Sequence, residues 1–114
     1  MEDLLIKTLK EFDFPVKRQG SLLPDEEYPE SFFTFWNNSS DGESFYDNNE
    51  IQTNWDFDVN FYSTDPELTY SVILRAKEQL KKAGFIISGK GHDVASDEVT
   101  HTGRGINVLY LERN

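Results

Sequence analysis

The chain has 114 residues, a formal net charge of -10 at pH 7 and no cysteine. Its length predicts one domain, since either half alone would bury too small a core. The lack of cysteine excludes disulfides, thiol nucleophiles and thiolate metal ligands, and it favours a cytoplasmic location. The first residues are acidic rather than a basic, apolar leader and no stretch approaches the ~20 apolar residues of a membrane span, so neither export nor membrane contact is expected.

The first element predicted is a short amphipathic helix. Residues 3–12 carry apolar or small side chains on one side at helical spacing, namely Leu5, Thr8, Leu9 and Phe12. The helix should end before Pro15, because the residue before a proline is disfavoured in helical geometry, and residues 14–16 then become extended. Residues 22–29, with two prolines and three acids, suit a surface connection.

Two strands and a loop are predicted next. Residues 31–36 are rich in β-forming side chains and should form a strand. Residues 37–50 are polar and are predicted as a long loop, the least ordered internal segment of the chain. Within this predicted loop, the candidate residues for a mobile assembly loop are Asp41, Glu43, Phe45, Tyr46 and Asp47.

The strand predicted over 53–62 alternates strictly between apolar and polar residues. Trp55, Phe57, Val59 and Phe61 should face a core, whereas Asn54, Asp56, Asp58 and Asn60 should face water. This alternation is typical of an antiparallel sheet with one packed face and one wet face. Most aromatic rings of these two strands are expected in the core, with one face left for a subunit partner.

A second helix is predicted over 66–83. Asp65 suits the N-cap, Pro66 the first helical position and Gly84 the left-handed position after the C-terminus. Residues 85–88 then predict a short strand, 89–91 a turn, and 99–111 a last strand with a bulge or bend at Gly103 and Gly105. The expected fold is α+β: a mostly antiparallel sheet of about four or five strands with two helices on one face.

The charges are unevenly distributed along the chain. No lysine or arginine occurs between Gln19 and Leu74, and the same interval holds twelve acids. Such a segment repels phosphate backbones, so sequence-specific binding of nucleic acid is not expected. A solubilising surface and a functional acidic face remain equal interpretations of this segment.

Two metal sites were weighed against ordinary surface residues. Asp56 and Asp58 on one strand face resemble carboxylate pairs that hold divalent ions, but the neighbouring interval offers no base. His92, Asp93 and His101 supply zinc-ligand types from the last hairpin, in polar surroundings without cysteine. Solvated side chains explain both sets better, so no catalytic, cofactor-binding or metal-binding residue is assigned.

Several segments together resemble the small tail-completion or tail-terminator proteins of tailed phages and prophages. The resemblance rests on the helix over 4–12, the stretch 31–36, the strand 55–63, the helix after Asp65-Pro66, and the segment 82–85, with the patterns W-x-F-x-V-x-F-Y-S and K-x-A-G-F. It implies a structural subunit, not an enzyme, that forms a homo-oligomeric ring, with a hexamer as one size it allows. Such a ring meets the tail tube protein on one side and the head–tail connector on the other, first in the host cytoplasm and then in the virion tail.

The wet strand face is the candidate site under this hypothesis. Asn54, Asp56, Asp58 and Asn60 would form either an acidic ring lumen that does not hold DNA or an interaction face. The first alternative is an acidic protein-binding or DNA-mimic regulatory module. The second is a metal-dependent hydrolase that uses Asp56, Asp58 and a histidine.

Overall fold

The computed structural model describes residues 2–18, 30–46, 49–87, 89, 91–95 and 100–113, with the backbone alone described at 39–46, 49–52 and 113. Within these residues two helices and five strands follow one another as α1 (Glu2–Lys10), β1 (Val16–Arg18), β2 (Ser31–Tyr46), β3 (Asn49–Ser63), α2 (Pro66–Lys82), β4 (His92–Val94) and β5 (Thr102–Arg113). Neither described helix is long and apolar enough to span a lipid bilayer.

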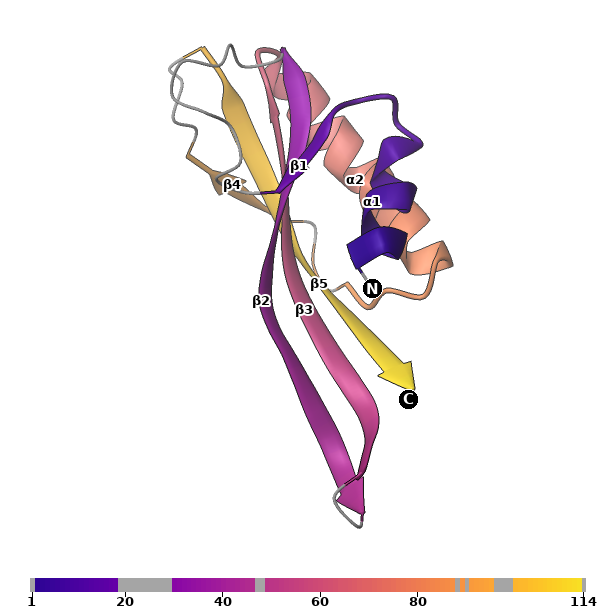
Figure 1. Cartoon of the computed structure of the whole chain (residues 1–114). Coiled ribbons are helices and arrows are strands. Elements are labelled where there is room, and N and C mark those ends of the chain that lie inside the picture. The colour runs from indigo at the N-terminus through magenta and orange to yellow at the C-terminus, as the bar shows by residue number, and fades with distance from the viewer. Residues whose placement is uncertain are drawn as a thin grey trace.

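The five strands form one mixed sheet in the order β1-β2-β3-β5-β4. Strand β1 runs parallel to β2, and the other neighbours are antiparallel. Both helices lie on the same side of the sheet (Figure 1). The predicted α+β class, with a mostly antiparallel sheet and two helices on one face, is confirmed.

Helix α2 begins and ends where the sequence predicts. The Asp65 side chain accepts a hydrogen bond from the Glu67 amide at 3.0 Å, and Pro66 occupies the first turn. At the other end Gly84 has φ +104°, and the Phe85 amide donates to the Leu80 carbonyl at 3.0 Å. This Schellman-type end turns the chain back toward the sheet, so that Phe85 enters the core.

The core lies between the helices and the covered face of the sheet. From the helices it takes Leu5, Leu9, Val72, Ile73, Ala76 and Leu80, and from the strands Phe33, Phe35, Phe57, Val59, Phe61, Ile106 and Val108. Phe57, Val59 and Phe61 of β3 are therefore buried, while Asp56, Asp58 and Asn60 between them are partly exposed, as the alternation over 53–62 predicts. Trp55, at the end of this row, is only half-buried and stacks on Phe57 at 5.9 Å between ring centroids.

The predicted loop at 37–50 is wrong over most of its length. Strand β2 continues to Tyr46 and β3 starts at Asn49, so the two strands form a long hairpin that projects past the helices (Figure 1). The register shifts once, between Asn37 and Ser39, and then stays in step to the end of the hairpin. Backbone hydrogen bonding to the strongly patterned strand that follows outweighs the weak β-propensity of Asn, Ser, Asp and Gly.

Most candidate residues of the predicted assembly loop lie on strand β2. Asp41 and Glu43 lie on β2, with Cα partners Asn54 and Gln52. Phe45 and Tyr46 also lie on β2, and Asp47 lies outside the described residues. The predicted mobility of this segment stays a prediction, whereas its description as a loop is corrected.

The last strand also differs from the prediction. Strand β5 pairs with β3 in unbroken register from Thr102 to Arg113, so the glycines mark no bulge. They leave room for neighbours instead: a Cβ atom on Gly103 would lie 2.7 Å from the Tyr62 ring and from Val94 Cγ2. The predicted strand at 85–88 is likewise wrong over its described residues 85–87, which form a single isolated bridge from Ile86 to Leu109 of β5. Ser88 lies outside the described residues.

Candidate functional site

The sheet has a second face that no described helix covers, and we name it the open face (Figure 1). Strand register places on it Phe32, Thr34 and Trp36 of β2, Asn54, Asp56, Asp58, Asn60 and Tyr62 of β3, Asn107, Leu109 and Leu111 of β5, and the bridging residue Ile86. All four residues of the predicted acidic face lie here and are partly exposed. The structure thus brings the predicted residues together on one surface.

Two carboxylates at the centre of the open face share an amide. Asn107 Nδ2 lies 2.6 Å from Asp56 Oδ1 and 3.1 Å from Asp58 Oδ1, and it also lies 3.2 Å from the Phe57 carbonyl oxygen. One amide group has two N–H donors for these three acceptors, so the bonds are shared. The amide lets two negative charges stand side by side on β3 while both remain accessible to an outside partner.

A β-bulge supplies a second donor to the same cluster. Asn38 is the extra residue at the register shift between Asn37 and Ser39. Its Nδ2 atom donates to Asp56 Oδ1 at 3.2 Å. Bulges redirect a side chain from its regular position, and here the redirected side chain is one that binds a carboxylate. We name Asn38, Asp56, Asp58 and Asn107 the carboxamide cluster.

Apolar side chains flank the carboxamide cluster on both sides. Trp36 is 49% exposed, Leu109 37%, Leu111 50% and Ile86 50%, and among the described residues the other large exposed hydrophobic side chain is Tyr70 of α2 at 46%. Register puts Trp36 opposite Asp58 and Leu109 opposite Asp56. Single exposed apolar residues are ordinary, but a group on one surface is typical of a protein-binding site.

The part of the open face near the start of β2 is closed by the protein itself. The Phe32 and Tyr62 rings stack at 5.3 Å between centroids, and the His101 ring meets Phe32 edge-on at 6.0 Å. Val94 of β4 covers Gly103 and Gly105. Phe32 and Tyr62 are therefore buried, and among the side chains that the structure describes the exposed apolar ones of the open face lie around the carboxamide cluster.

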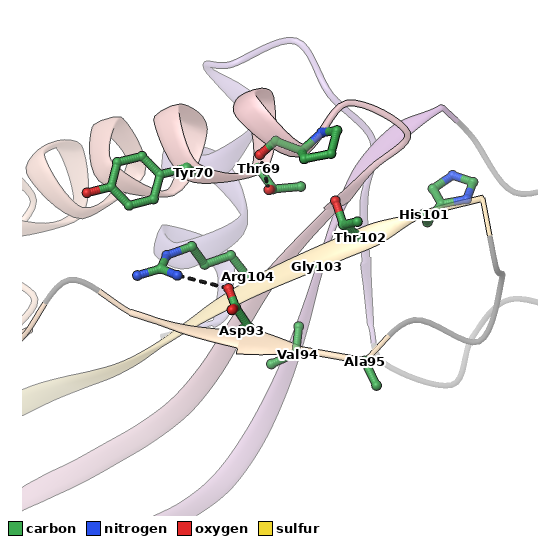
Figure 2. Close-up of a pocket in the computed structure, with 10 residues that line it drawn as sticks. Thr69, Tyr70, Asp93, Val94, Ala95, His101, Thr102, Gly103 and Arg104 are labelled. Atoms are coloured by element: carbon green, nitrogen blue, oxygen red, sulfur yellow. Dashed lines mark hydrogen bonds and ion pairs between the residues drawn. The ribbon is translucent and has the colours of Figure 1, made fainter.

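A cavity of about 450 Å³ lies at another edge of the molecule, between the first half of α2 and the hairpin of β4 and β5 (Figure 2). Its lining includes Thr69, Tyr70, Asp93, Val94, His101 and Arg104. The Arg104 guanidinium forms an ion pair with Asp93 at 3.0 Å and lies 5.0 Å from the centroid of the Tyr70 ring.

Polar side chains that line this cavity also bind backbone groups of the protein. Arg104 also donates to the Gly91 carbonyl oxygen at 3.3 Å, and the Thr69 hydroxyl donates to the Pro66 carbonyl oxygen at 2.6 Å. Arg104 of β5 thus links β4, through its ion pair with Asp93, to α2, through its contact with the Tyr70 ring. We therefore interpret the contacts among Arg104, Tyr70 and Asp93 as structural.

The residues weighed for metal binding are dispersed. No group of three His, Cys, Asp or Glu side chains with metal-binding geometry occurs among the described residues. His92 pairs with Gly105, four residues along β5 from His101, which corresponds to about 13 Å of strand. Asp93 is bound to Arg104, and Asp56 and Asp58 share the Asn107 amide.

Two residues of the open face were not singled out from the sequence. Trp36 was included among the core aromatic residues, although it follows Phe33 and Phe35 out of phase in the period of two. Asn107 sits between the buried Ile106 and Val108, and this alternation is a readable signal. That its amide meets two carboxylates depends on the pairing of β3 with β5, which the sequence alone does not specify.

No protein-family model matches the chain, and no curated protein matches it.

Proposed function

We propose that the protein is a structural subunit that assembles with other protein chains through its open face, as a ring subunit at the end of a phage tail. The observation that carries this proposal is the exposed group of Trp36, Ile86, Leu109 and Leu111 around the carboxamide cluster. Burying apolar surface against another chain gains about 25 cal/mol per Å², so such a group gains most from a protein partner. The phage-tail role comes from the family resemblance.

The apolar flanks favour an interaction face over a ring lumen. A channel that carries DNA is filled with water, and water would leave Trp36, Leu109 and Leu111 exposed in the assembled particle. A partner chain would cover them and leave Asp56 and Asp58 to select its charge. The same flanks disfavour a DNA mimic, because a surface that imitates the phosphates of B-DNA, about one every 1.7 Å, has no use for exposed apolar side chains between its charges.

The test is genetic complementation in the phage or prophage that carries the gene. Deletion should leave filled heads and tails that fail to join, and the wild-type gene supplied in trans should restore infectious particles. Trp36→Ala together with Leu111→Ser should fail to restore them. Tyr70→Ala is the matched control: it removes a ring of similar exposure from α2, together with its contact to Arg104, and it should complement because the Arg104–Asp93 ion pair remains. Normal yields of joined particles without the gene would contradict the proposed function.

A double charge reversal distinguishes an interface from a channel wall as the location of Asp56 and Asp58. Asp56→Lys with Asp58→Lys should abolish ring assembly if the open face is an interface. If the acids line a channel, rings and tails of normal length should form while infectivity falls because the channel holds phosphate. Electron microscopy of the particles distinguishes the two outcomes.

A further inference from the structure

The helical layer carries charge of the opposite sign to the open face. The last half of α2 presents Arg75, Lys77, Lys81 and Lys82 against one acid, Glu78, and Arg75, Lys81 and Lys82 are exposed. We name Lys81 and Lys82, in the last turn of α2, the basic end. The basic end and the open face lie on opposite sides of the sheet layer (Figure 1).

We infer that the partner on the open face is a second copy of this chain, which docks the basic end of its α2 against the carboxamide cluster. The inference rests on the proposed function and specifies which two surfaces meet. Each copy carries both halves of the contact, acids on one side and bases on the other, so charge complementarity is supplied without another protein. The basic end reaches outward from the helical layer, whereas its neighbours Ala76 and Leu80 are buried.

Like charges argue against the symmetric alternative. If two open faces met across a two-fold axis, Asp56 and Asp58 of one copy would approach those of the other, and four carboxylates would lose water without gaining a cation. A head-to-tail contact between two different surfaces avoids this. Such contacts close into rings when the rotation between copies closes, which is the geometry that a tail-end ring needs.

The open face offers specific chemistry to a lysine. Trp36 and Asp58 are cross-strand partners, so an ammonium group placed there meets the face of an indole and a carboxylate together. The aliphatic stem of the same lysine can lie along Leu109 or Leu111. The Asn107 amide holds both carboxylates in place before the partner arrives. Lys81 and Lys82 are both exposed in the last turn of α2. Adjacent helix residues point about 100° apart, so their flexible stems bend toward one surface when both ammonium groups meet Asp56 and Asp58.

The experiment is sedimentation velocity on the full chain over a concentration series at low salt. Reversal of the open face (Asp56→Lys with Asp58→Lys) or of the basic end (Lys81→Glu with Lys82→Glu) should each weaken self-association at least about tenfold. Combining all four substitutions should restore most of it, because the contact is then formed with its charges exchanged. Tyr70→Ala is the control and should associate like wild type, and circular dichroism should show each variant folded.

A mixing experiment tests the head-to-tail geometry. Trp36→Ala keeps an intact basic end, and the basic-end reversal keeps an intact open face, so a mixture of the two should form a one-to-one complex that neither forms alone. A wild-type protein that stays monomeric at millimolar concentration would overturn the inference, and so would a combined variant that fails to recover. If either occurs while Trp36→Ala with Leu111→Ser still fails to complement, the partner is another protein and the proposed function stands. If those substitutions complement, the proposed function fails as well.

Discussion

The two faces of strand β3 differ in polarity and burial, although they alternate along one backbone. Phe57, Val59 and Phe61 are fully buried beneath α1 and α2. Asp56 and Asp58, the residues between them, stand partly exposed beside Asn107. One face is therefore satisfied by the chain's own helices and determines whether the protein folds. The other face retains exposed apolar side chains and two charges, which are properties typical of a protein-binding surface.

The largest expected effect is on the covered face. Phe57→Ala removes a fully buried ring that packs between the sheet and the helices, and it should lower the free energy of unfolding by about 3–5 kcal/mol. Trp36→Ala on the open face should lower it by less than about 1 kcal/mol, because half of that side chain is already in water. Urea unfolding of both variants measures the difference. Equal losses would contradict the division of the sheet into a folding face and a binding face.

A smaller effect is expected where the open face is closed by the protein itself. Gly103→Ala places a Cβ atom 2.7 Å from the Tyr62 ring and from Val94, so both must move. Overpacking of this kind should cost about 1–3 kcal/mol. Gly89→Ala is the control for a general loss of glycine, since no atom lies within 4 Å of its Cβ position, although its φ of +75° adds backbone strain.

The contact with Val94 can be tested separately by thermal unfolding. Because Val94→Ala removes one of the two clashing groups, Gly103→Ala should lower the melting temperature less in a Val94→Ala background than in the wild-type background.

The carboxamide cluster should contribute less. Asn107→Ala removes the donor that Asp56 and Asp58 share, and the free energy of unfolding should fall by about 1 kcal/mol. Part of this loss is repulsion between the two carboxylates, so added salt should recover some of it. Chemical unfolding at low and high ionic strength measures this recovery. A loss that salt does not change would show that Asn107 acts through packing alone.

The smallest effect on stability is expected from neutralising the acids. Asp56→Asn with Asp58→Asn preserves size and leaves one acceptor oxygen at each position, so the free energy of unfolding should change by less than about 1 kcal/mol. Self-association should nevertheless weaken, because the basic end of α2 loses its anionic partners. Sedimentation of the folded double variant tests this pairing of a small stability change with a large binding change.

The sequence was most informative where local and tertiary requirements coincide. The Asp65-Pro66 start and Gly84 end of α2 were predictable because caps are set by neighbouring residues. The burial of Phe57, Val59 and Phe61 was predictable because a strand alternates with a period of two.

The rest depends on partners that are distant in the chain. The hairpin over 37–46 has few β-forming residues, and its strand geometry comes from pairing with β3. In the sequence Gly103 predicts a bulge, whereas in the structure it leaves room for Tyr62 and Val94, which occupy the place of a side chain. The open face was predicted through Asp56 and Asp58, but the amide of Asn107 and the exposure of Trp36 follow from the strand order.

Trp36 reports directly on whether another protein chain covers the open face in the assembled state. The chain has two tryptophans, and Trp55→Phe removes the other while keeping a ring to stack on Phe57; Trp55 itself donates to Glu112 at 3.1 Å. Acrylamide quenching of the remaining Trp36 fluorescence should be efficient in dilute protein and fall several-fold as the concentration rises and copies assemble. Unchanged quenching of Trp36 in a sample that sedimentation shows to be assembled would mean that the open face is not the surface that another chain covers.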